Sequence, residues 1–154
     1  MIEWRKANVP PNILDADPNE PVYRALCPHS NHKFDKKGRP IYIEKTGQIS
    51  LPKLLKHLSP ETIITRHIRQ QEIAMKRMGE EGVRRGEHID KQLIILDLKG
   101  LSLMPNQTGI NIFKETVRID QVSKKGRAIW GISECFYRHS ILTFSIFRAT
   151  TQKH

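Results

Sequence analysis

The alternation of hydrophobic and polar residues predicts two β-strands in the middle of the chain. The first lies near residues 41–45, where β-branched and aromatic side chains precede a turn signal at Thr46-Gly47. The second lies near residues 92–98 and contains four consecutive aliphatic residues, Leu93–Leu96. A continuous aliphatic run is typical of a strand buried on both faces, so we expect cover on each side of it.

The segment between these strands carries two helix start signals. Ser50 begins a short helix to about Leu58, and Ser59 followed by Pro60 begins a longer one, because serine is a favoured N-cap and proline is tolerated in the first turn. The longer helix is expected to reach about Met78 and to end in the glycine-rich stretch that follows. Its expected apolar stripe consists of Ile64, His67, Ile68, Gln71, Met75 and Met78.

A further helix is expected over residues 106–119, with Ile110, Phe113 and Val117 on one stripe. Residues 1–39 are expected to be loop-like, because prolines recur through them and disfavour helix at the preceding residue.

The order strand, helices, strand, helix predicts an α/β fold in which parallel strands are joined by a right-handed crossover. We expect Ile64, Ile68 and Met75 to pack against the two strands. Two strands do not make a stable sheet, so the predicted sheet is incomplete. After residue 119, only Leu142–Ile146 alternates as a strand does.

The charge of the chain is unevenly distributed. The 154 residues carry a formal net charge of +10. Residues 122–154 hold six lysines and arginines against one glutamate, together with five of the ten aromatic residues. Residues 1–121 hold twenty basic residues against fifteen acidic ones. Half of the net positive charge therefore lies in the short, aromatic segment 122–154, and the other half is spread over residues 1–121.

Two motifs carry a resemblance to a known family. The first is Asp35–Glu44, with the sequence DKKGRPIYIE, followed by Gly47 and a leucine-rich short helix. The second is Ile94–Ser102, with the sequence IILDLKGLS. In this order and spacing they resemble the CRAL-TRIO lipid-binding domain, and within it the phosphatidylinositol transfer proteins of the Sec-fourteen kind. The resemblance covers roughly residues 22–121.

The resemblance implies a monomeric carrier and not an enzyme. An apolar pocket floored by a β-sheet would hold one phospholipid, phosphatidylinositol or phosphatidylcholine, and exchange it between membranes. The bound phospholipid is the only ligand implied, and no cofactor is expected. No apolar stretch has the roughly 18 residues of a membrane span, and no signal peptide follows Met1. We therefore expect a cytoplasmic protein that meets anionic membrane surfaces peripherally.

Six residues form the predicted lipid-binding set. By resemblance, Tyr42 and Ser102 stand where the family lines its cavity or meets a headgroup. Packing within the sheet for Tyr42 and a turn hydroxyl for Ser102 are equally good interpretations. The other four members, core residues under either interpretation, are Leu93, Ile95, Ile64 and Ile68.

The resemblance also divides the chain. Residues 1–39 are expected to be a linker from a missing helical N-terminal lobe, residues 40–121 the first half of the lipid-binding domain, and residues 122–154 an unrelated tail. Val122-Ser123 is what a consensus intron donor would encode in frame, so intron read-through is a hypothesis for this tail. A chain truncated in this way is expected to transfer phospholipid poorly.

Other chemistries are disfavoured. Cys27, His29 and His32 offer three zinc ligands where a structural site needs four, so no metal site is expected. Asp97 ends an aliphatic strand, but the sequence has neither a phosphate-binding glycine loop nor a nucleophile elbow.

Two alternative functions stay open. One is a basic nucleic-acid-binding module, although no recognisable binding motif points to a specific nucleic acid. The other is a regulatory interaction fragment without lipid transfer. Affinity that falls steeply with salt would indicate the first, and failure to retain lipid would indicate the second.

Overall fold

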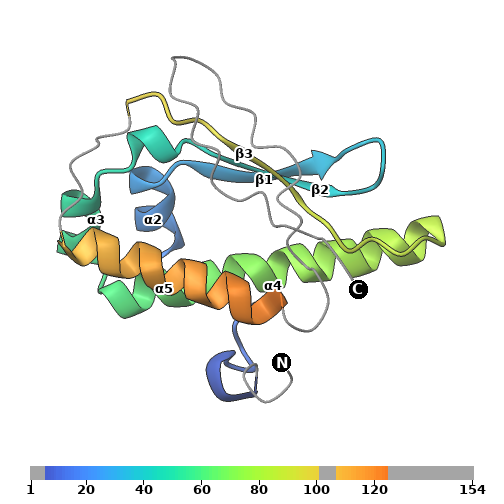
Figure 1. The fold of residues 1–154 in the computed structure, drawn as a ribbon, viewed down its shortest axis with the longest axis horizontal. Helices are drawn as coiled ribbons and strands as arrows, with labels where there is room; N and C mark the ends of the chain where they lie inside the picture. The colour runs from blue at the N-terminus through green and yellow to red at the C-terminus, as the bar shows by residue number, and fades with distance from the viewer. Residues whose placement is uncertain (1–5, 101–106, 125–154) are drawn as a thin grey trace, which may run out of the picture.

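A three-stranded sheet organises the computed structural model, which describes residues 6–100 and 107–124 (Figure 1). Its strands are β1 (His29–Phe34), β2 (Pro40–Glu44) and β3 (Leu93–Leu96), in the spatial order β1-β2-β3. β1 pairs with β2 in the antiparallel direction, and β2 pairs with β3 in the parallel direction. The predicted parallel pairing of the two aliphatic strands is therefore confirmed.

Helices fill the connection between β2 and β3 and follow β3. A short 3-10 turn and α3 (Leu51–His57) lead into the long helix α4 (Pro60–Arg85). α5 (Gln107–Lys124) lies side by side with α4, and α4 contacts β2 (Figure 1). No helix of the described residues is long and apolar enough to cross a membrane.

The long helix α4 continues past its predicted end. Gly79 and Gly82 lie inside it, and the helix ends only at Gly86, whose φ of 67° is left-handed. A glycine in a helix costs about 0.5–1 kcal/mol relative to alanine, which tertiary packing readily outweighs. A left-handed C-cap removes the helical geometry itself, so Gly86 is the residue that ends α4.

The loop expected over residues 1–39 is wrong at two places. α2 (Glu20–Leu26) forms because Pro21 occupies its first turn, where a proline lacks no needed hydrogen bond. β1 has the polar sequence HSNHKF, which is a weak strand signal, and it forms by pairing with β2 at the edge of the sheet. Both elements depend on neighbours that lie elsewhere in the sequence.

The principal apolar cluster joins three helices. Leu54 and Leu58 belong to α3 and the residue that follows it, Ile63 to α4 and Ile112 to α5, and all four are buried. Tyr23 of α2 is one of the partly buried residues packed against them. The cluster holds α2, α3, α4 and α5 together at one end of the sheet.

In α4, α5 and β3 the residues that are buried differ in part from the residues that the sequence predicts to be buried. On α4, Ile68 is buried as expected, whereas Ile64 and Met75 are only half-buried. On α5, Phe113 is 65% exposed, because Ile112 occupies the buried position instead. The residues of β3 are all half-buried, so the prediction that Leu93–Leu96 is buried on both faces is wrong for the described structure.

Candidate functional site

One face of the sheet is covered by α4. Gln70 of α4 donates from Nε2 to Oδ1 of Asn31 in β1 at 2.7 Å. Asn31 pairs with Tyr42, and Tyr42 pairs with Ile94. Because paired residues of neighbouring strands project from the same face, all three lie on the α4 side. Tyr42 is accordingly buried, with 9% of its surface exposed.

The opposite face of the sheet is aliphatic and half-exposed. The parallel register pairs Ile41 with Leu93 and Ile43 with Ile95. These residues alternate with Tyr42 and its neighbours, so they project away from α4. Each of the four is half-buried. We call this patch of Ile41, Ile43, Leu93 and Ile95 the open face.

The α4 side of the sheet holds a polar cluster around one carboxylate. The Tyr42 hydroxyl donates to Oε2 of Glu44 at 2.7 Å, and the Thr46 hydroxyl donates to Oε1 of Glu44 at 2.9 Å. Burial, followed by the nearby Glu44 carboxylate, raises the pKa of Tyr42. Tyr42 is therefore a neutral donor whose proton is already engaged by Glu44.

The three candidate zinc ligands of the sequence serve as packing and strand residues. Cys27 is 1% exposed, and burial raises the pKa of its thiol to about 12, so the thiol stays protonated near neutral pH. The His29 ring lies edge-on to Tyr23 at 5.5 Å between centroids, and its Nδ1 is 2.8 Å from the Cys27 carbonyl oxygen. His32 is exposed on β1. The described residues contain no group of three or more side chains that could hold a metal ion.

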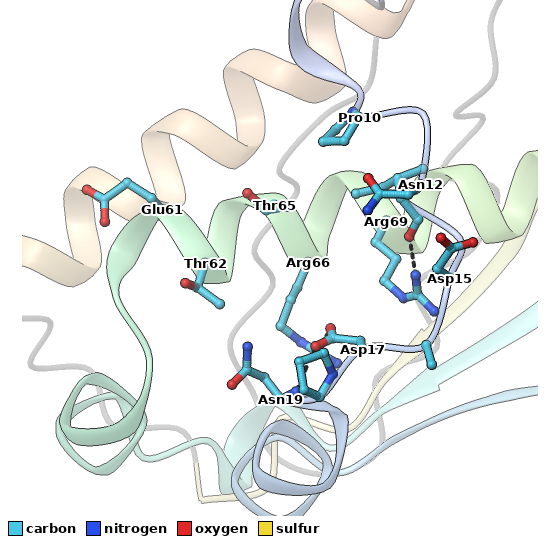
Figure 2. A pocket seen from close by; sticks show the side chains of 13 residues that line it. Pro10, Asn12, Asp15, Asp17, Asn19, Glu61, Thr62, Thr65, Arg66 and Arg69 are labelled. Atoms are coloured by element: carbon cyan, nitrogen blue, oxygen red, sulfur yellow. Dashed lines mark hydrogen bonds and ion pairs between the residues drawn. The ribbon is translucent and has the colours of Figure 1, made fainter.

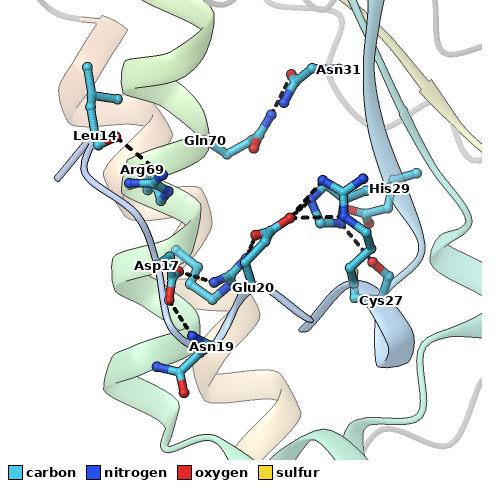
Figure 3. A network of polar contacts seen from close by, with 12 residues as sticks. Leu14, Asp17, Asn19, Glu20, Cys27, His29, Asn31, Arg69 and Gln70 are labelled. Carbon is cyan, nitrogen blue, oxygen red and sulfur yellow. Dashed lines mark hydrogen bonds and ion pairs between the residues drawn. The ribbon is translucent and has the colours of Figure 1, made fainter. Parts of the chain in front are cut away.

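An ion-pair network joins α2 and the preceding turn to α4. The buried Arg66 guanidinium pairs with Asp17 and Glu20 and lies 4.1 Å above the Tyr23 ring centroid. Glu20, which Figure 3 shows near Asp17 within this network of polar contacts, also accepts from Arg24 at 2.8 Å. Burial acts to raise the pKa of Glu20, but the hydrogen bonds from Arg24 and Arg66 outweigh it and lower the pKa overall. Arg66 thus anchors α2 on α4.

A separate cavity of about 340 Å³ lies between residues 10–19 and the first half of α4 (Figure 2). Threonines, asparagines and charged side chains form much of its lining, and Arg69 crosses to the carbonyl oxygen of Ile13. None of its lining residues belongs to the open face, so the cavity is a different part of the molecule.

The loops that follow β2 and β3 meet at their carboxyl ends. The Gly47 N–H donates to the Asp97 carbonyl oxygen at 2.8 Å. A Cβ at position 47 would lie 2.3 Å from the Lys99 carbonyl oxygen, and Gly100 opposite has a φ of 89°. Only glycine permits this close approach, which fixes the two strand ends relative to each other.

The predicted lipid-binding residues are divided between the two faces of the sheet. Leu93 and Ile95 lie on the open face, Tyr42 lies on the covered face, and Ile64 and Ile68 belong to α4, which covers that face. The second predicted headgroup residue, Ser102, lies outside the described residues. The structure brings Leu93 and Ile95 together and does not bring them to Tyr42. Their roles toward lipid stay predictions.

Sequence reasoning missed two members of the open face and the buried arginine that anchors α2 on α4. Ile41 and Ile43 complete the open face, and the alternation of β2 could have identified them. Arg66 is 7% exposed in the middle of the apolar face of α4. No local pattern announces a buried arginine, because its partners Asp17 and Glu20 lie more than 40 residues away.

Comparison with known proteins yields a family match over much of this region. The family described as the CRAL/TRIO domain matches residues 29–127, which include all three strands and all of α3, α4 and α5. The match begins at β1, ahead of the predicted domain start at residue 40.

The chain is also similar to curated transfer proteins. It is 35% identical over 95 residues to "Phosphatidylinositol/phosphatidylcholine transfer protein SFH11" of Arabidopsis thaliana, covering 60% of this chain and 25% of the relative. It is 30% identical over 118 residues to "Sec14 cytosolic factor" of Schizosaccharomyces pombe, covering 71% of this chain and 41% of the relative. The matched region thus covers less than half the length of either relative.

Proposed function

Because the chain belongs to the CRAL/TRIO domain family, we propose that it binds a phospholipid of the phosphatidylinositol or phosphatidylcholine type and contributes to its transfer between membranes. The names of the relatives support this ligand class. The proposal is a monomeric carrier, not a catalyst, and it needs no cofactor besides the lipid. It includes peripheral contact with a membrane, where the lipid is collected and released.

The open face is the observation that carries this proposal. It presents four aliphatic side chains, Ile41, Ile43, Leu93 and Ile95, on one side of a parallel strand pair. Each methylene that an acyl chain buries against such a surface contributes about 0.8 kcal/mol. A lipid tail lying along β2 and β3 would cover the parts of these four side chains that are exposed in the described structure.

The described residues favour lipid binding over rapid exchange. In this proposal the open face is the floor of an acyl site, and residues 6–100 and 107–124 contribute no further strand that would enclose it. A single apolar surface can bind lipid by burying part of an acyl chain. A carrier that shields two acyl chains from water needs a cavity closed on every side. We therefore expect detectable retention of phospholipid and slow transfer between vesicles.

The test combines lipid retention with a polar substitution on the open face. Wild-type chain and Ile95→Asp are incubated with vesicles that contain phosphatidylinositol and phosphatidylcholine, repurified, and analysed for bound lipid by mass spectrometry. A carboxylate in the acyl site removes several methylene contacts, so we expect retention to fall at least about tenfold. The matched control is Val83→Asp, at an α4 position that is 87% exposed, which should retain lipid as the wild type does.

Three outcomes would each contradict a part of the proposal. Equal retention of lipid by Ile95→Asp and wild type would show that the open face does not contact the bound lipid. Complete absence of co-purified lipid would favour the alternative of an interaction fragment that carries none. Brisk, saturable exchange by the wild-type chain would instead show that the site is enclosed, contrary to the slow transfer expected here.

A further inference from the structure

The turn between β1 and β2 lies at one end of the sheet (Figure 1), and three lysines, Lys33, Lys36 and Lys37, lie in it and just before it. We propose that this surface, the basic hairpin of Lys33, Lys36 and Lys37, docks the protein on the anionic phospholipid headgroups of a bilayer. The inference rests on the proposed function, because a lipid carrier has to meet a membrane, and it names the residues that make the contact.

The hairpin is held rigid by a single carboxylate. Oδ1 of Asp35 accepts from the backbone N–H groups of Lys37 at 2.9 Å and Arg39 at 2.8 Å, and Oδ2 accepts from Nε of Arg39 at 2.7 Å. Gly38 supplies the left-handed residue of the turn, with a φ of 76°. The lysines are thus presented on a preorganised turn, which lowers the entropy cost of binding.

The charge of the three lysines is uncompensated. Asp35, the acid within the turn, is neutralised by its ion pair with Arg39 at 2.7 Å. Lys33, Lys36 and Lys37 are exposed, and no carboxylate of the described residues forms an ion pair with them. Three unpaired cations within five residues create a local positive potential that salt bridges elsewhere in the molecule do not cancel.

The last turns of α4 support the hairpin from beneath. Arg77 donates to the carbonyl oxygens of His32 and Lys33, and its guanidinium lies 4.8 Å from the Phe34 ring centroid. Arg85 donates to the Lys36 carbonyl oxygen at 3.5 Å. Both arginines therefore fix the position of the hairpin, and Arg77 adds positive charge behind it, whereas Arg85 is ion-paired with Glu87 at 3.1 Å.

The composition of the surface favours a bilayer over a nucleic acid. Phe34 is 36% exposed between the lysines, and an aromatic ring beside cations suits the apolar and polar layers of a membrane interface. Each lysine near an anionic bilayer contributes about 1 kcal/mol, a factor of about five in affinity. Such a contact is weak enough to be reversible, as a protein that shuttles between membranes requires.

The test measures cosedimentation of the 154-residue chain with vesicles of equal parts phosphatidylcholine and phosphatidylserine, and with phosphatidylcholine alone. We expect Lys36→Gln/Lys37→Gln to bind the anionic vesicles about 25-fold more weakly than the wild type, at a factor of about five for each lysine. The matched control is Lys53→Gln/Lys56→Gln, which removes the same charge from exposed positions of α3. Far-UV circular dichroism confirms that both variants are folded.

Three results would overturn the inference. Wild-type binding by the hairpin variant would exclude the hairpin, and an equal loss in the α3 variant would reduce the effect to net charge. Binding of a single-stranded RNA that the hairpin variant loses, without vesicle binding, would assign the surface to nucleic acid. These vesicles contain no phosphatidylinositol, and docking is measured separately from lipid retention. Failure of the retention assay would therefore contradict the proposed function without deciding whether the hairpin docks on the membrane.

Discussion

At the residue scale, two glycines occupy opposite environments. A Cβ at Gly47 would lie 2.3 Å from the Lys99 carbonyl oxygen and 2.6 Å from that of Leu98. Those are backbone atoms, which cannot move aside as a flexible side chain does. We expect Gly47→Ala to lower the free energy of unfolding by about 1–3 kcal/mol or more, the usual cost of overpacking, as measured by urea denaturation.

The matched control is Gly79→Ala. A Cβ there meets no atom within 4 Å, and the residue lies in the interior of α4. Alanine lowers the entropy cost of helix formation, so the free energy of unfolding should rise by about 0.5–1 kcal/mol. Equal effects of the two substitutions would show that the loops after β2 and β3 do not approach each other as described.

Protonation of Asp35 makes the free energy of unfolding depend on pH. Burial acts to raise the pKa of its carboxyl, but hydrogen bonds from Arg39 and Lys37 outweigh it and lower the pKa below the ordinary value of 3.8. The folded state therefore binds the proton less tightly than the unfolded state. The stabilisation is complete above about pH 4 and is lost as the pH falls through the lowered pKa.

The variant Asp35→Asn tests this linkage. At pH 7 it should lose about 1–3 kcal/mol of unfolding free energy, because donors to the carboxylate lose a charged acceptor. Below pH 4 the wild-type and variant stabilities should converge, as urea denaturation at a series of pH values will measure. Curves that stay parallel from pH 7 to pH 3 would contradict the assigned role of the carboxylate.

At the element scale, two serines at helix starts differ in what their side chains do. Ser59 Oγ accepts from the Thr62 N–H at 3.2 Å and caps α4, whereas Ser50 precedes α3 without a side-chain cap. We expect Ser59→Ala to cost about 1 kcal/mol of unfolding free energy and Ser50→Ala only a few tenths. Thermal denaturation of the two variants provides the measurement, and a larger loss for Ser50→Ala would refute the assignment.

At the scale of the whole molecule, α5 is joined to the rest of the structure by the buried Ile112 and Ile119 and by a 2.8 Å contact between Asp120 Oδ1 and His67 Nε2 of α4. The Ile112 side chain enters the cluster formed by Leu54, Leu58 and Ile63, while its neighbour Phe113 is 65% exposed. Ile112→Ala should lower the unfolding free energy by about 2–5 kcal/mol, the range for buried aliphatic truncations. Phe113→Ala should change it by no more than about 0.5 kcal/mol. Chemical denaturation distinguishes the two, and a reversed order would place the other stripe of α5 in the core.

Long periodic or aliphatic segments determined much of the fold. The run Leu93–Leu96, the β-rich segment before Glu44 and the Ser59-Pro60 start signal each act within a few residues, so the strands, the long helix and their parallel order followed from sequence. The family also followed from two local motifs. Local signals suffice where one segment's own chemistry decides its conformation.

Tertiary structure decided what depends on distant partners. β1 is a strand because β2 pairs with it, and Arg66 is buried because Asp17 and Glu20 lie beside it. The stripe of α5 is set by the cluster that Ile112 joins, a choice that neighbouring apolar residues leave open. The division of Tyr42 from Leu93 between two faces follows from strand register and the position of α4, which no window along the sequence contains.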